Sequence, residues 1–133
     1  MTKSKRSGIF VAGAILLAVC TTSASPGIAA KNGCNAQAGK QIAQMCVACH
    51  SFDSGRNMTG PALRGVVGRS AASAKGFRYS RALMNLDINW TTANLDKFLS
   101  GPQKFAKGTT MAFGGLPDKQ RRADLICYLK TLK

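Results

Sequence analysis

The sequence predicts a small all-α domain. Apolar residues recur at three- and four-residue spacing near both ends of residues 31–133, and the stretch between them is rich in glycine and serine. No internal repeat or low-complexity segment interrupts the pattern. These 103 residues suffice for one domain but leave only a marginal core of side chains. A buried group that adds apolar surface would make such a domain more stable.

Residues 1–30 resemble a secretory signal peptide. Three basic residues precede an apolar run of about a dozen residues, and small residues follow up to Ala30. The run is shorter than the roughly 20 residues that a membrane-spanning helix needs. We predict cleavage after Ala30, with Ala24 as the alternative, and a mature domain of residues 31–133 in the periplasm.

Cys20 raises the alternative of a lipid-anchored protein, because a lipoprotein signal ends immediately before a cysteine. The residue before a lipidated cysteine is normally small, whereas Val19 is large. The sequence therefore favours an exported domain with neither an acyl anchor nor a stable membrane span.

The first two predicted helices frame a long loop. Asn35 can cap a helix that extends to Met45, in which Ala38, Ile42 and Met45 share one face. Residues 51–80 are predicted to be mostly loop, with a Gly-Pro turn at 60–61. Thr91 or Thr92 then begins a short helix that Gly101 and Pro102 end.

A final helix is predicted to begin at Pro117 and Asp118. Its apolar stripe has three- and four-residue spacing and consists of Leu125, Tyr128, Leu129 and Leu132. Because the first and last helices each present an apolar face, we expect them to pack together.

Residues 46–50, Cys-Val-Ala-Cys-His, form the C-x-x-C-H pattern that attaches haem covalently, and His50 is the only histidine. Helical spacing would bring both thiols to the haem vinyl groups and the imidazole to the iron. A zinc site would need a second pair of ligands, but the other cysteines are scattered. A thioredoxin-type dithiol would follow a strand, and no alternating apolar run precedes it. We therefore predict one haem c, held by two thioethers at Cys46 and Cys49.

The iron needs a sixth ligand, and methionine is the remaining soft donor. Met45 precedes Cys46 and cannot reach the opposite haem face, whereas Met58 and Met84 have no distinctive neighbours. Met111 lies in a glycine-bounded loop that can place its thioether over the open face. His50 and Met111 are therefore the predicted metal ligands.

The chain is strongly basic, with a formal charge of +14 that falls to +11 without the leader's three basic residues. Lysine and arginine are spread along the chain, and the one Arg121-Arg122 pair forms no nucleic-acid stripe. We expect acidic protein surfaces as partners and no nucleic acid. A merely solvated basic surface is the alternative.

Residues 35–133 resemble the class I cytochrome c family, in particular its mitochondrial and alphaproteobacterial branch. The matching motifs are CVACH at 46–50, GPALRGVVGR at 60–69, FRYS at 77–80, Trp90, GTTMAF at 108–113 and RADLICYL at 122–129. The resemblance implies an all-α cytochrome c fold whose helices surround the haem, with contact between the terminal helices through Ile42, Leu125 and Tyr128.

The resemblance also assigns roles around the haem. The carbonyl of Pro61 would accept the Nδ1 proton of the proximal histidine. Arg69, Tyr79 and Trp90 match positions that hold the propionates, although each alone would suit an ordinary surface charge or core aromatic. Phe113 matches the aromatic residue beside the exposed haem edge.

Three positions depart from the family pattern. Phe98 replaces a tyrosine whose hydroxyl often reaches the methionine sulfur, and Leu83 replaces an asparagine that often orders a buried water. Lys107 replaces the proline that usually stiffens the methionine loop. We expect a drier pocket and a looser loop.

Cys34 and Cys127 are left without a role. In an oxidising compartment they are candidates for a disulfide, but Cys127 lies away from the apolar stripe of its helix. The sequence therefore favours two free thiols and leaves the disulfide as the alternative.

The sequence thus predicts a monomeric electron carrier and not an enzyme. His/Met ligation leaves no open coordination position on the iron. The resemblance implies a quinol-cytochrome c oxidoreductase as electron donor and a terminal oxidase, photosynthetic reaction centre or peroxidase as acceptor, as in a respiratory chain. Two alternatives remain: a haem subunit that stays docked to one periplasmic dehydrogenase, and a haem protein that binds peroxide or a gas.

Overall fold

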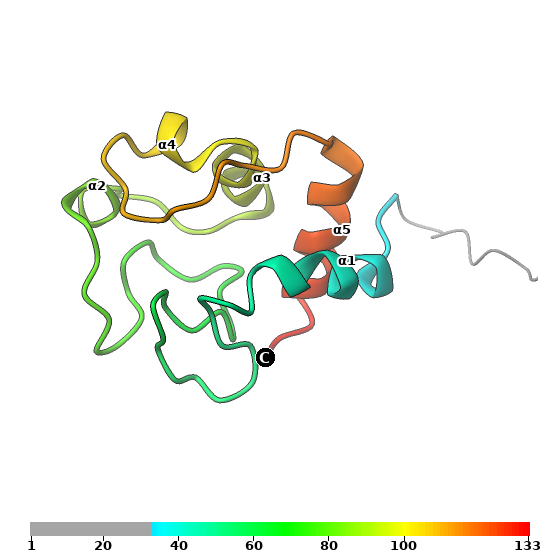
Figure 1. The fold of residues 1–133 in the computed structure, drawn as a ribbon, viewed down its shortest axis with the longest axis horizontal. Coiled ribbons are helices and arrows are strands. Elements are labelled where there is room, and N and C mark those ends of the chain that lie inside the picture. Colours follow the sequence, from blue (N-terminus) through cyan, green and yellow to red (C-terminus); the bar gives the residue numbers. More distant parts are fainter. Residues whose placement is uncertain (1–32) are drawn as a thin grey trace, which may run out of the picture.

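The computed structural model describes residues 33–133, and the expected signal peptide and Cys20 lie outside this range. In chain order its elements are α1 (Ala36–Ile42), the 3-10 helix η1 (Ala43–Met45), α2 (Arg81–Met84), α3 (Thr92–Ser100), α4 (Pro102–Phe105) and α5 (Lys119–Leu129) (Figure 1). This part of the chain contains no named strand, only an isolated bridge between Ser70 and Asn89. None of its helices has both the length and the apolar composition to cross a membrane. The all-α prediction is confirmed.

Side-chain caps explain where three of the helices begin. The Asn35 carboxamide accepts hydrogen bonds from the backbone N–H groups at positions 37 and 38, at 2.9 and 3.1 Å. The Thr91 hydroxyl caps α3, and the Asp118 carboxylate caps α5. Each cap satisfies N–H groups that have no partner inside the helix. The predicted starts at Asn35 and Thr91 are confirmed.

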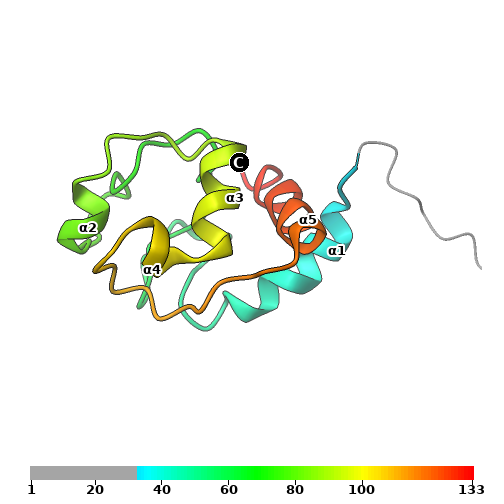
Figure 2. The same ribbon diagram turned by 90° about the horizontal axis from the view of Figure 1, so that it is seen from above.

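Helices α1 and α5 lie side by side although they come from opposite ends of the described chain (Figures 1 and 2). Their closest approach is at Gly39, which is buried and where an added Cβ would collide with the backbone carbonyl of Asp124. The Asp124 carboxylate in turn accepts a hydrogen bond from the backbone N–H of Asn35 at 2.7 Å. The expected packing of the terminal helices is confirmed, and it depends on a glycine that the periodicity did not identify.

Cys34 and Cys127 form a disulfide, with Cα atoms 6.2 Å apart. The preference for two free thiols was wrong. Cys34 lies before α1 and not on its apolar face, so Cys127 can pair with it without lying in the apolar stripe of α5.

The structure corrects several helix boundaries. The first helix tightens into η1 at Ala43, and α5 ends at Leu129, so Leu132 packs against the core from beyond the helix. Pro102 begins α4 where we expected only a helix end, since proline suits the first helical position. The four-residue α2, capped by Ser80, was not predicted.

The buried core fills the space between α3 and α5 and continues into the loops. On α3, Phe98 contacts Trp90 and Phe105, with ring centroids 4.9 and 5.8 Å apart. On α5, Leu125 and Ile126 are almost completely buried. This core forms one side of the cavity described next.

Candidate functional site

One cavity, of about 240 Å³, is lined by all nine residues that the sequence singled out for the haem site. They come from the turns after η1, from the long loop, from the segment between α2 and α3 and from the loop between α4 and α5. They are Cys46, Cys49, His50, Pro61, Arg69, Tyr79, Trp90, Met111 and Phe113.

The C-x-x-C-H motif lies in turns directly after η1 and not in a regular helix, as its spacing had suggested. The backbone N–H groups of Cys49 and His50 both donate to the carbonyl of Cys46, at 3.1 and 2.9 Å. The second bond has the i to i+4 spacing of a helical turn, so the three side chains keep the relation that the motif requires.

His50 is buried and oriented by a single strong contact. Its Nδ1 lies 2.7 Å from the carbonyl oxygen of Pro61, which makes Nδ1 the protonated nitrogen and leaves Nε2 with its lone pair. The ring packs directly onto Gly60, where a Cβ would lie only 2.7 Å from Nδ1 and 2.8 Å from Nε2. The imidazole is therefore fixed in both orientation and position.

Burial also affects the first thiol of the motif. It raises the pKa of the Cys46 thiol above the ordinary value, with a smaller contribution from the charge of Cys49. The free Cys46 thiol is therefore neutral at neutral pH. Cys46 is partly buried, whereas the side chain of Cys49 is exposed to solvent.

Arg69 has an unsatisfied buried donor at the cavity. Its two terminal nitrogens donate to the carbonyls of Arg64 and Ala62, at 3.1 and 3.0 Å, while its buried Nε–H has no partner among residues 33–133. The hydroxyl of Tyr79, which also lines the cavity, accepts a hydrogen bond from the backbone N–H of Ala74 at 3.2 Å and keeps its own proton to donate. Both donors suit an anionic group in the cavity.

Met111 lies in the loop between α4 and α5 and is half-buried. Of the four methionines in residues 33–133, only Met45 and Met111 line the cavity, and Met45 directly precedes Cys46. Met58 and Met84 are 42% and 56% exposed and lie elsewhere. Only Met111 reaches the cavity from a segment remote from the thiols.

The remaining lining is mainly apolar. Phe98 and Leu83, which depart from the family pattern, both line the cavity. Leu95 and Leu99 also line it and were not predicted, although they are buried one turn apart on α3 and their spacing could have identified them. The apolar cavity thus presents two thiols, an imidazole, a thioether and an unpaired guanidinium N–H. This set of groups fits a covalently attached haem.

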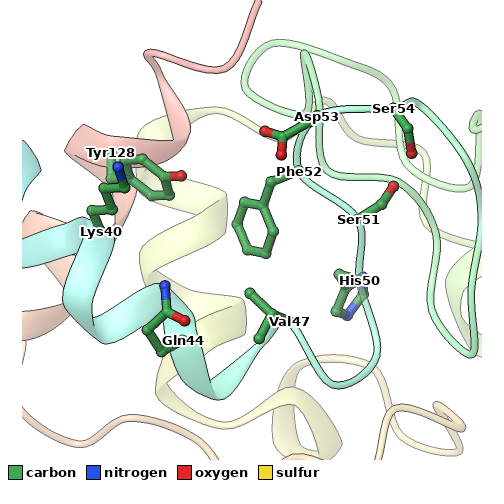
Figure 3. A pocket seen from close by; sticks show the side chains of 9 residues that line it. All are labelled: Lys40, Gln44, Val47, His50, Ser51, Phe52, Asp53, Ser54 and Tyr128. Atoms are coloured by element: carbon green, nitrogen blue, oxygen red, sulfur yellow. The ribbon is translucent and has the colours of Figure 1, made fainter.

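His50 also lines a second, more open groove of about 450 Å³, which Figure 3 shows from close by. Phe52 occupies its middle and contacts Tyr128 of α5 at a centroid distance of 5.9 Å. The rest of the lining is mostly polar and includes only His50 of the nine predicted residues. In the part of the chain that the structure describes, no group of three or more His, Cys, Asp or Glu side chains could hold a metal ion. The apolar cavity that all nine predicted residues line is therefore the candidate site.

Comparisons with known proteins agree with this geometry. A family model described as "Cytochrome c" matches residues 36–133. The chain is 49% identical to cytochrome c of Euglena viridis over 85 residues, which cover 64% of this chain and 83% of the relative. It is 47% identical to cytochrome c2 of Rhodopila globiformis over 89 residues, which cover 67% and 84%. The solved structure of cytochrome cH from Methylobacterium extorquens matches with a TM-score of 0.70 and 41% identity, covering 73% of this chain and 98% of that one.

Proposed function

The chain belongs to the cytochrome c family of electron carriers, whose cofactor is covalently attached haem c, and on this premise we propose how its own residues serve a periplasmic carrier. Cys46 and Cys49 would hold the haem through thioethers, and His50 and Met111 would be the ligands of its iron. When bound, the haem supplies a one-electron redox centre. The observation that supports this assignment most directly is the single cavity lined by all nine predicted residues.

The groups that line the cavity would each have a role in binding the haem. The Pro61 carbonyl keeps Nδ1 of His50 protonated, which directs Nε2 to the metal and increases its basicity. The unpaired Nε–H of Arg69 and the hydroxyl of Tyr79 would donate to the haem propionates. The apolar lining excludes water, and Met111 would supply the thioether ligand to the iron, which would leave no open site for a substrate.

The basic surface would guide the encounter with redox partners. We propose acidic faces of membrane electron-transfer complexes, a quinol-cytochrome c oxidoreductase as donor and a terminal oxidase or reaction centre as acceptor. The charge of +11 on residues 31–133 would raise association rates, and salt would lower them. Electron-transfer rates with purified complexes should fall steeply with ionic strength. Copurification with one dehydrogenase and no such salt dependence would favour the alternative of a dedicated subunit.

The ligand assignment predicts a loss of methionine ligation in Met111→Ala. The ferric wild-type protein, produced in a periplasmic host that matures c-type haem, should show the weak near-red charge-transfer band that reports a methionine sulfur on iron. Met111→Ala should lose this band but keep the covalent haem spectrum, because the thioethers do not depend on Met111.

Met84→Ala is the matched control, because Met84 is exposed and outside the cavity. It should retain the band. Loss of the band in both variants, or in neither, would contradict the assignment of Met111.

A further inference from the structure

We propose that Gln103 is a positioning residue that holds the Met111 loop over the cavity. Its Nε2 donates to the backbone carbonyls of Thr109 and Met111, at 2.8 and 3.3 Å. One side chain thus restrains both residues that flank Thr110. This inference rests on the proposed ligation by Met111.

The position of Gln103 is itself well anchored. It lies on the short helix α4, whose first residue, Pro102, is fully buried. At the end of α4 the Phe105 ring contacts Phe98 and Trp90, with centroids 5.8 and 6.3 Å apart. Gln103 therefore connects a rigid part of the core to the loop.

The loop needs such a connection. Between Gln103 and Leu116 it contains no proline, and Gly108 has a φ of 91° that only glycine adopts readily. Met111 is only half-buried, and its backbone N–H makes a long 3.3 Å bond to the Thr109 hydroxyl. Besides the amide of Gln103, the Met111 carbonyl accepts one hydrogen bond, from the N–H of Phe113. Without Gln103, the thioether would be held mainly by local contacts inside the loop.

The test is displacement of the methionine by imidazole added to the ferric holoprotein. Gln103→Glu keeps the length of the side chain but places a carboxylate against two carbonyls, and Gln103→Leu removes the donor without adding charge. We expect imidazole to bind about tenfold more tightly to both variants, which corresponds to about 1.4 kcal/mol of lost loop stabilisation. Amide exchange at Phe113 should accelerate as well, because the loop would open more often.

Gln41→Glu is the matched control for the change of charge, since Gln41 is an exposed residue of α1, remote from the loop. It should bind imidazole like the wild type. Denaturant unfolding of both Gln103 variants should lose no more free energy than the gain in imidazole affinity corresponds to, because the two lost bonds hold only the closed loop.

The outcomes separate this inference from the proposed function. A wild-type protein with the methionine charge-transfer band and variants with unchanged imidazole affinity would overturn the role of Gln103 alone. A fall in global stability without a gain in imidazole affinity would also overturn it, because Gln103 would then stabilise the fold whether the loop is closed or open. Absence of the band from the wild type would overturn both.

Discussion

The two walls of the cavity are held in different ways. The wall around His50 is closed by backbone hydrogen bonds between neighbouring segments: Gly60 N–H to Cys49 O at 2.7 Å, and Leu63 N–H to Ser51 O at 2.9 Å. The wall around Met111 has local backbone bonds, but it is tied to the helices mainly by side chains that reach it from α4 and α5, together with the backbone bond from Leu116 N–H to Leu99 O of α3.

This difference predicts how substitutions in each wall affect the proposed iron ligand that the wall carries. Backbone bonds formed within some fifteen residues tolerate little movement, and a side-chain substitution other than proline leaves their donors and acceptors in place. Side-chain contacts from distant elements can be removed singly. We therefore expect changes at the His50 wall to affect folding, and changes at the Met111 wall to affect ligation first.

The largest effect is expected from Gly60→Ala. A methyl group at this position would meet the ring atoms of His50, and the ring cannot withdraw because the Pro61 carbonyl holds Nδ1. Overpacking of this kind costs about 1–3 kcal/mol, and we expect at least the upper end here. Guanidinium unfolding of the holoprotein and the yield of covalent haem would measure the loss.

Gly114→Ala on the opposite wall is the matched control. No atom lies within 4 Å of its added methyl group, and its φ is not positive. It should unfold like the wild type. Equal stability of both variants would refute the idea that the His50 wall is the more rigid one.

An intermediate effect is expected from Arg122→Leu, which removes a side chain from the Met111 wall. One guanidinium nitrogen of Arg122 donates to the carbonyls of Leu116 and Pro117 at 2.8 and 2.7 Å, where the loop joins α5. Its Nε also pairs with Asp96 at 2.7 Å, but this carboxylate is 37% exposed and its contribution is small. The two orphaned carbonyls should cost about 2 kcal/mol in denaturant unfolding. The methionine charge-transfer band should also disappear at a lower denaturant concentration than the fold.

Arg121→Leu removes the same charge from an exposed neighbour, whose side chain forms no hydrogen bond within residues 33–133. It should leave both transitions unchanged. Coincident loss of the band and of the fold in Arg122→Leu would mean that the loop has no independent stability.

The same contrast explains what the sequence could predict. The C-x-x-C-H spacing and the apolar stripes are local patterns, so the haem motif and the two terminal helices followed from them. The hydrogen bonds from Gln103 and Arg122 to the carbonyls of the loop were not predicted. No local sequence pattern shows which backbone carbonyl a glutamine or an arginine will contact in the folded chain. The Cys34–Cys127 disulfide was missed for a related reason: a helical wheel describes one helix, whereas Cys34 lies before α1 and not on its apolar face.

The smallest effect, and the sharpest probe of the Met111 wall, is expected from Phe98→Tyr. Phe98 is buried on α3 and lines the cavity, so a hydroxyl at its ring would enter an apolar space near the proposed thioether. A hydrogen bond to the sulfur would withdraw electron density from it and favour the ferrous state. A net hydrogen bond of about 0.5–1.4 kcal/mol corresponds to a rise in midpoint potential of about 20–60 mV for one electron.

Spectroelectrochemical titration of Phe98→Tyr and of the wild type measures this shift. Phe105→Tyr is the control, because the Phe105 ring belongs to the same aromatic cluster but does not line the cavity. Equal midpoints for Phe98→Tyr and the wild type would mean that the hydroxyl does not reach the sulfur, and that the Met111 wall stands farther from α3 than the proposed ligation requires.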